Sequence, residues 1–378
     1  MIAANPVGRY NSSIEIVNHQ SNLPLLTPSS FRELVSGRTR GVGATLARGV
    51  LRAAETPYAL AMRLRNRLYD AGRKEVVQVG VPVVSVGNLT LGGTGKTPFV
   101  AWLARWFREK GVRVTLVSRG YGAERGQQND EARELEQKLP DVPHVQNPDR
   151  VAAARLAIEE FDCQLILLDD GFQHRRIARD LDIVLLDALE PFGFGHVFPR
   201  GTLREPLVGL RRAHVVGLSR ADAVTPDQRA AIRERVKHCA PDALWIEVAH
   251  QPQSLLNAAG ERQPLTALAG QKVAAFCGIG NPAGFRHTLA QCGVEIAAFR
   301  EFPDHHAYSR EDVESLAARA CSTVAAAVLC THKDLVKLGV STLGANPLYA
   351  VEIGLTFLSG QEEFEQLATS VLEKIQPE

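Results

Sequence analysis

Apolar runs alternate with amphipathic stretches along most of the chain from Val81 onward. Consecutive apolar residues at 81–86 and 112–118 have the length and composition of buried strands. The stretches at 98–111 and 149–161 instead repeat apolar residues at helical spacing. Further strand-like runs follow at 163–170, 181–188, 213–219 and 243–249. Buried strands joined by helices predict an α/β fold, with a mostly parallel sheet covered by helices on both faces.

The same pattern returns after a looser stretch. Residues 251–270 mix polar residues, proline and glycine without clear periodicity, so we expect a linker between a core at 76–250 and a second unit. Three strand-like runs at 272–279, 294–302 and 325–331 follow the linker. The sequence therefore predicts a smaller second α/β domain over residues 271–378.

The N-terminal part has a different composition. Residues 1–35 are mostly polar and are expected to form a loose extension. Within the segment at 36–75, residues 38–73 contain eight arginines against Glu55 and Asp70, which leaves a local net charge of +6. Apolar residues recur between the arginines at helical spacing, with an expected interruption near Pro57. The segment is either a helix pair packed on the core or a basic amphipathic surface that contacts an anionic membrane.

Bulk composition narrows the function classes. The 378 residues carry a net charge of +1, with 45% apolar and 22% charged residues, as in an ordinary globular protein. This balance gives no reason to expect nucleic acid as a partner. The six cysteines show no C-x-x-C pair and fit reduced thiols better than a disulfide or metal framework. No run of 18 apolar residues and no secretory signal is found in the sequence.

The first chemical motif is a glycine-rich loop between a strand and a helix. The loop has Thr90 where the pattern G-x-x-x-x-G-K-[ST] has its first glycine. The remaining positions still suit a phosphate loop, in which backbone N–H groups and a lysine cradle the phosphates of a nucleotide. We expect the phosphate-binding residues to be Gly92, Gly93, Thr94, Gly95, Lys96 and Thr97. The fold expected for residues 76–250 is therefore like that of the P-loop NTPases.

Two carboxylates follow the apolar run at 163–168. Asp169 and Asp170 come at the expected end of a strand, where ligands of parallel sheets bind. With the hydroxyl of Thr97, they could hold the Mg²⁺ that accompanies a nucleotide. The alternative is a strand-end turn with solvated acids.

An Asp–His motif, "FPDHHAYS", lies in the expected second domain. Asp304, His305 and His306 follow a strand, and such a pair can accept a hydroxyl proton. Ser309, with Asp312 three residues later, is typical of a helix N-cap. A surface turn is the alternative, and a zinc site lacks a clear third ligand.

The tetrapeptide "THKD" at 331–334 follows another strand. It is similar to the guanine-reading loop of GTPases, but it lacks the usual asparagine and lies in the expected second domain. A guanine-specific role is therefore not favoured.

Taken in order, several segments resemble one family. They are "RNRLYDAG", "VPVVSVGNLTLGGTGKTP", "SRGYG", "NDE", "DRVAAAR", "LDDGFQHRRIARDLDIVLLDA", "GTLREPL", "FCGIGNP" and "FPDHHAYS". Together they resemble the tetraacyldisaccharide 4′-kinases of lipid A biosynthesis, over roughly residues 60–340. The phosphate loop of that family also lacks the early glycine.

The resemblance implies an activity and a location. It implies ATP-dependent, Mg²⁺-assisted phosphorylation of the 4′-hydroxyl of an acylated glucosamine disaccharide 1-phosphate, which gives lipid IVA. It also implies a peripheral protein at the cytoplasmic face of the bacterial inner membrane. The basic segment at 36–75 would then be its membrane-contact surface.

Site roles carry over by position. The resemblance implies that Asp130 and His305 together activate the sugar hydroxyl while Lys96 stabilises the transferred phosphoryl group. The other matching positions are Arg119, Glu131, Arg150, Gln173, His174, Glu205, Asp304 and His306. Asn129 replaces the family's glycine before the Asp–Glu pair, and asparagine is the non-glycine residue that best tolerates left-handed backbone angles.

Two other classes of protein share part of this pattern. A ParA/MinD-type membrane ATPase has a similar loop, but it carries a lysine where this chain has Leu91. A nucleotide-binding module without catalysis has no need for an Asp–His pair.

Overall fold

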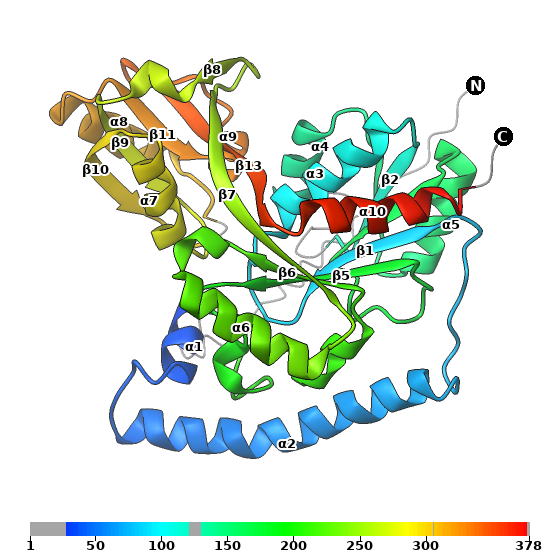
Figure 1. The fold of residues 1–378 in the computed structure, drawn as a ribbon. Coiled ribbons are helices and arrows are strands. Elements are labelled where there is room, and N and C mark those ends of the chain that lie inside the picture. Colours follow the sequence, from blue (N-terminus) through cyan, green and yellow to red (C-terminus); the bar gives the residue numbers. More distant parts are fainter. Residues whose placement is uncertain (1–27, 121–129, 305, 376–378) are drawn as a thin grey trace, which may run out of the picture.

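A computed structural model describes residues 28–120, 130–304 and 306–375. One continuous sheet of thirteen strands runs through the whole molecule, with helices on both faces (Figure 1). Its main path has the order β10-β9-β11-β13-β7-β6-β5-β1-β4-β2-β3. Off this path, β12 pairs with β13 and β8 pairs with β7. The pairs along the path are parallel except for β13 with β7. The predicted α/β fold with a mostly parallel sheet is confirmed.

The first half of the sheet contains the expected core. Its strands are β1 (Val83–Asn88), β2 (Val114–Ser118), β3 (His144–Gln146), β4 (Leu165–Asp169), β5 (Leu181–Asp187), β6 (Val215–Ser219) and β7 (Leu244–Leu256). Its helices are α3 (Lys96–Glu109), α4 (Asp130–Lys138), α5 (Arg150–Phe161) and α6 (Pro226–Cys239). Every residue of β1 and β4 is buried, which explains why these strands read as continuous apolar runs.

The second half continues the sheet. It consists of β8 (Arg262–Pro264), β9 (Lys272–Cys277), β10 (Glu295–Glu301), β11 (Ala327–Thr331), β12 (Thr342–Leu343) and β13 (Asn346–Ser359). The helices α7 (Pro282–Gln291), α8 (Arg310–Ser322), α9 (His332–Leu338) and α10 (Gln361–Leu372) belong to this part of the chain. The predicted cap of α8 is confirmed, because Ser309 and Asp312 form a reciprocal capping box.

The expected linker at 251–270 is wrong. Strand β7 continues to Leu256 and pairs with β13 over most of its length, so a two-stranded antiparallel ribbon joins the two halves. Gln251 and Gln253, which made this stretch look like a linker, are exposed and alternate with the half-buried Pro252 and Ser254 along the strand.

The last helix returns to the first half. Phe364 of α10 is fully buried and packs edge-on against Phe99 of α3, with ring centroids 5.6 Å apart. Trp102 and Phe357 complete this aromatic cluster. Residues 361–372 therefore pack on the core, although the sequence placed them in the second domain.

Two helices precede the sheet. The end of the expected loose extension forms α1 (Pro28–Val35), and α2 (Val42–Asp70) is a single helix of 29 residues. The expected interruption near Pro57 is wrong: Tyr58 and Glu55 on either side hydrogen-bond to the core, and this docking holds the helix through its proline. No helix within the described part of the chain is long and apolar enough to cross a membrane.

We expect Phe364→Ala to lower the free energy of unfolding by about 3–5 kcal/mol, because it empties a fully buried aromatic site. The matched control is Phe161→Ala at the end of α5, where the ring is 45% exposed and the loss should stay below about 1 kcal/mol. Denaturant titration of both variants measures the difference. Equal losses would show that α10 contributes nothing specific to the core.

Candidate functional site: a phosphate loop beside a charged cluster

The phosphate loop lies between β1 and the N-terminus of α3, as the sequence predicts. Gly92 and Gly95 both have positive φ angles, of 110° and 73°, and Gly95 is the residue before the first helical turn. Lys96 and Thr97 begin the helix, so backbone N–H groups at its N-terminus are available to an anion.

The missing first glycine has a local explanation. Thr90 is buried and forms an isolated antiparallel bridge with Leu203. The Asn88 side chain donates to the Thr90 and Gly92 carbonyl oxygens at 3.0 and 3.3 Å. These bonds shape the start of the loop. Extended backbone at Thr90 therefore takes the place of the glycine that begins loops with the pattern G-x-x-x-x-G-K-[ST].

Asp169 and Asp170 occupy the end of β4 beside this loop. Asp169 is buried, and Asp170 adopts a left-handed φ of 56°. The Asp170 carboxylate accepts hydrogen bonds of 2.7 and 2.9 Å from Arg204 and lies 3.5 Å from the Lys96 ammonium group. Burial alone would raise the pKa of Asp170, but the charges of Lys96 and Arg204 outweigh it and hold that pKa below its usual value.

A second layer of polar contacts supports Arg204. Gln173 lies beside it and donates to the Asn88 carbonyl at 3.0 Å and to Glu205 at 3.2 Å. Glu205 is almost fully buried and also accepts bonds from Arg212 and from Asn66 of α2. Glu205 therefore acts as an internal acceptor that ties α2 to the site, rather than as a group facing a ligand.

Arg150 interacts with both carboxylates, and the basic residues Arg119 and His174 interact with Arg150. Arg150, at the start of α5, is buried, and its desolvation lowers its pKa although Asp170 opposes the shift. Arg119 is exposed, and its charge also acts on Arg150. Desolvation, together with the charge of Arg150, lowers the pKa of His174 to about 4, so this imidazole is neutral at pH 7.

The predicted catalytic pair lies at the margin of what the structure describes. Helix α4 begins at Asp130, but the side chains of Asp130 and Glu131, and the whole of Asn129 and His305, lie outside the described residues. The neighbours of His305 are described. Asp304 lies 3.6 Å from Lys333, and His306 bonds to Asp312 at 2.8 Å while it stacks on Phe302.

No group of three or more histidine, cysteine, aspartate or glutamate side chains converges to hold a metal within the described ranges.

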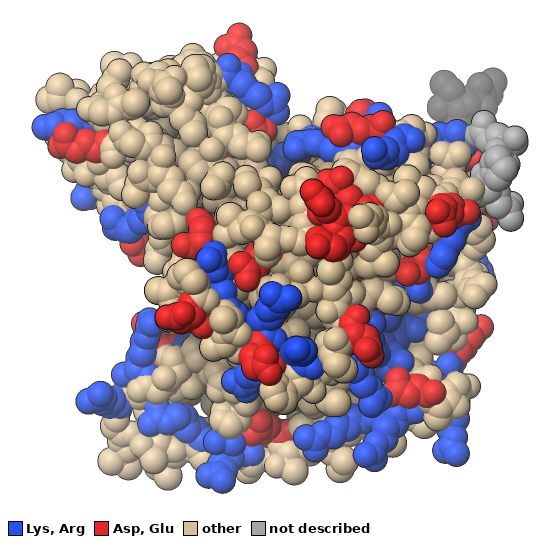
Figure 2. Space-filling model, in the orientation of Figure 1, with Lys and Arg blue, Asp and Glu red and all other residues tan. Residues whose placement is uncertain are grey.

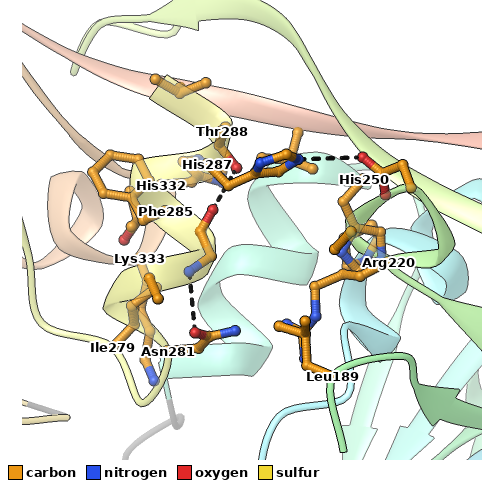
Figure 3. A pocket seen from close by; sticks show the side chains of 18 of the residues that line it. Leu189, Arg220, His250, Ile279, Asn281, Phe285, His287, Thr288, His332 and Lys333 are labelled. Atoms are coloured by element: carbon orange, nitrogen blue, oxygen red, sulfur yellow. Dashed lines mark hydrogen bonds and ion pairs between the residues drawn. The ribbon is translucent and has the colours of Figure 1, made fainter. Parts of the chain in front are cut away.

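A cavity of about 490 Å³ opens beside the phosphate loop, between the two halves of the sheet. Figure 3 shows Ile279, Asn281 and Phe285 on one side of it, facing Leu189 and Arg220 on the other. Its walls combine apolar side chains with polar and charged ones, which suits the binding of a small ligand with polar groups.

Sequence reasoning missed two side chains of this cavity. Arg220 follows β6, donates to Asp187 at 2.9 Å and reaches the Gly93 carbonyl at 3.4 Å. His250 of β7 is hydrogen-bonded to Ser219 at 3.2 Å and lies against Gly95. Burial, followed by the charge of Arg220, lowers the pKa of His250 to about 3, so the ring is neutral. Arg220 could have been found from its place at the carboxyl end of a parallel strand, whereas nothing local marks His250.

Comparison with known proteins identifies the family. The family model described as Tetraacyldisaccharide-1-P 4′-kinase matches residues 47–373. A tetraacyldisaccharide 4′-kinase of Anaeromyxobacter sp. is 40% identical over 86% of this chain and 91% of its own length. That of Geobacter metallireducens is 39% identical over 82% of this chain and 95% of its own. The crystal structure of the "apo" form of LpxK from Aquifex aeolicus in complex with ATP is 30% identical and covers 86% of this chain and 99% of that chain, with a TM-score of 0.67.

This chain belongs to the tetraacyldisaccharide-1-phosphate 4′-kinase family. The family predicted from the motifs is therefore confirmed, as are the kinase class and the use of a nucleotide. The alternative of a ParA/MinD-type switch is not favoured.

We expect Gly95→Ala to lower the free energy of unfolding by about 2 kcal/mol or more, because an alanine would hold a left-handed φ and its Cβ would collide with the His250 ring. Gly93→Ala is the control, since a Cβ there meets nothing within 4 Å, and its effect on unfolding without nucleotide should stay within about 0.5 kcal/mol.

Adding His250→Ala to Gly95→Ala separates the two causes. The second change should recover the part of the loss that the collision causes and leave the part due to the backbone angle. Thermal unfolding without nucleotide of Gly95→Ala, of Gly93→Ala and of the double variant Gly95→Ala/His250→Ala tests this. No recovery in the double variant would show that the collision is not part of the cost.

Proposed function

We propose that this chain transfers the γ-phosphoryl group of ATP to the 4′-hydroxyl of a tetraacylated glucosamine disaccharide 1-phosphate. The observation that carries the proposal is the phosphate loop beside the Lys96–Asp170–Arg204 cluster, in a chain of this kinase family. Phosphoryl transfer depends on positioned phosphates and on cations at the charge that develops in the transition state. The relatives are named for this acceptor.

The phosphate loop supplies the first requirement. In the proposal, backbone N–H groups of Gly92–Thr97 bind the phosphates, with Lys96 and Arg204 as cations beside the γ-phosphate. Asp170 holds both cations in place when no phosphate is present. The nucleoside of ATP would lie in the cavity that Leu189, Arg220 and Phe285 line, next to the loop.

A divalent cation fits the carboxylates beside the loop. The hydroxyl of Thr97 and the carboxylates of Asp169 and Asp170 are hard oxygen donors of the kind Mg²⁺ prefers. When bound, Mg²⁺ would neutralise part of the charge on the β- and γ-phosphates. The charge of Asp170 is already balanced by Lys96 and Arg204, so we assign the closest ligand role to Asp169 and Thr97.

Activation of the acceptor is assigned to Asp130 and His305. The 4′-oxygen would attack the γ-phosphorus while the bond to the β–γ bridging oxygen breaks, and ADP leaves. The hydroxyl proton would pass to the Asp130 carboxylate, with the His305 ring oriented beside it. The Nε2 of His306 is engaged by Asp312 at 2.8 Å, and we keep His305 as the base partner because of its position in the motif.

The membrane contact is assigned to the exposed face of α2. Figure 2 shows basic side chains spaced along the edge of the molecule that α2 forms. Between them lie apolar side chains that are 56–80% exposed: Val42, Leu46, Val50, Leu60 and Leu64. A basic helix with an exposed apolar face suits the surface of an anionic bilayer. We infer a peripheral protein at the cytoplasmic face of the inner membrane, where its acylated acceptor would be embedded.

The proposed activity is tested by incubating the chain with labelled ATP, Mg²⁺ and disaccharide 1-phosphate in detergent. We expect a 4′-phosphorylated product, with Lys96→Ala nearly inactive. Asp130→Ala and His305→Ala should each lower kcat by about 100-fold or more, because general-base catalysis is lost. The double variant should be little worse than the worse single one, since the two act as a unit.

Three results would contradict parts of this assignment. ATP turnover that needs no acceptor lipid would favour a switch ATPase. Fully multiplicative losses would mean that Asp130 and His305 act independently. Damage from His306→Ala with little from His305→Ala would reverse the choice of histidine.

We expect liposomes with anionic lipid to bind the chain in a salt-sensitive way, since each basic residue near such a surface contributes about 1 kcal/mol. The triple variant Leu46→Ser, Val50→Ser and Leu60→Ser should reduce flotation strongly while the protein stays folded, because these side chains are exposed. A control with Leu156→Ser, Val324→Ser and Leu358→Ser removes exposed apolar groups elsewhere. Equal flotation of both triple variants would refute a specific role for α2.

A further inference from the structure

The THKD motif has no role in the proposed chemistry, and the structure excludes base reading by its acid. Asp334 is completely buried. Its carboxylate accepts hydrogen bonds from the Thr331 hydroxyl at 2.6 Å, the Tyr308 hydroxyl at 2.8 Å and the Gly278 N–H at 3.2 Å. An aspartate that reads guanine must face the ligand, whereas this one faces the protein interior.

The three donors come from three different segments. Thr331 ends β11, and Gly278 belongs to the loop after β9. Tyr308 belongs to the segment 302–309 after β10, which contains the Asp–His motif and is called the Asp–His loop below. A buried carboxylate is costly unless its oxygens are paired, so these bonds fix where the three loops lie relative to one another. Burial, with the adjacent Asp334, raises the pKa of Tyr308, so its hydroxyl keeps its proton and continues to donate.

Two lysines of the same helix hold the residues on either side of position 305. The Lys333 ammonium lies 3.6 Å from the Asp304 carboxylate. The Lys337 ammonium donates to the His306 carbonyl at 3.2 Å. Side chains of α9 therefore contact the Asp–His loop at three residues: Lys333 pairs with Asp304, Lys337 bonds to His306, and Asp334 bonds to Tyr308.

Helix α9 also contacts the helix that begins at the other member of the proposed catalytic pair. Helix α9 packs against α4, whose first residue is Asp130. Glu134 and Lys138 of α4 form an ion pair of 2.8 Å, and they line the same cavity as His332 and Lys333 of α9. The helix thus lies between the two segments that carry the proposed acid–base residues.

We propose that Asp334 is a positioning residue for phosphoryl transfer. Through its hydrogen bonds with Tyr308 and Gly278, it fixes the position of the Asp–His loop relative to α4. This inference rests on the proposed function, because it acts through His305. Proton transfer requires heavy atoms about 2.6–3.2 Å apart, so a small displacement of the loop is costly to kcat. In the proposed function the phosphates of ATP bind at the loop in the other half, and Asp334, Tyr308 and Gly278 do not line the cavity assigned to the nucleoside, so the affinity for ATP should change little.

The central test is Asp334→Asn in the full chain, assayed with ATP, Mg²⁺ and the disaccharide 1-phosphate. The amide keeps the size of the side chain but places an N–H group against one of the three donors. We expect kcat to fall about tenfold or more, with KM for ATP within about twofold of the parent. In a His305→Ala background, Asp334→Asn should lower kcat by less than about twofold, because the loop then has no base partner to position.

Glu352→Gln is the matched control. Glu352 is also a buried carboxylate of the second half, and it accepts bonds from Ser254 and Arg262 rather than from the Asp–His loop. It should lower the thermal unfolding temperature comparably and leave kcat within about twofold. If Asp334→Asn does not fold, Tyr308→Phe removes a single donor to Asp334 and should give a smaller kcat loss with the same lack of additivity.

The outcomes separate this inference from the proposed function. If His305→Ala is damaging but Asp334→Asn leaves kcat unchanged, or if their losses multiply, only the positioning role is overturned. An equal kcat loss in Glu352→Gln also overturns it, since general destabilisation then explains the effect. If the parent transfers phosphate and His305→Ala is harmless, the catalytic pair itself is wrong and the positioning role falls with it.

Discussion

The pairing of Asp170 with Lys96 and Arg204 is the interaction on which the site depends. A pocket built for a triphosphate must gather positive charge, and that charge must be balanced when no anion is bound. Asp170 provides the balance from the end of β4, at contacts of 2.7 to 3.5 Å. Asp170 therefore holds both cations in place, and in the proposed function a phosphate group competes with this carboxylate for them rather than with bulk water alone.

The support of this cluster extends to the N-terminal helix. Arg204 is followed in sequence by Glu205, which bonds to Gln173 and to Asn66 of α2. The Tyr58 hydroxyl of α2 also donates to the Arg204 carbonyl at 3.0 Å. The helix that carries the proposed membrane face is thus hydrogen-bonded to Arg204 and Glu205, next to the proposed phosphate site. The proposed bilayer contact and the chemical site share one polar network.

Much of the fold and of the phosphate site could be predicted from local sequence. Buried parallel strands are continuous apolar runs, and Gly95 followed by Lys96 is a local signature of a helix N-terminus that binds phosphate. The missed features are all long-range. Strand β7 looked like a linker because its second half is exposed on one side, and α2 passes through Pro57 because tertiary contacts stabilise it. His250 reaches the loop from 155 positions along the chain, which no local pattern encodes.

The ribbon of β7 and β13 has a mechanical consequence. The two halves of the molecule are joined by a ladder of backbone hydrogen bonds, so their relative movement must twist or bend an elastic element instead of swinging on a slack tether. In such a ladder a twist is distributed over many hydrogen bonds, and the ladder relaxes to its original geometry when the twisting force ends. Because His250 is part of this ladder and its ring lies against Gly95, any torsion of the ribbon would be transmitted to the backbone of the proposed phosphate-binding loop.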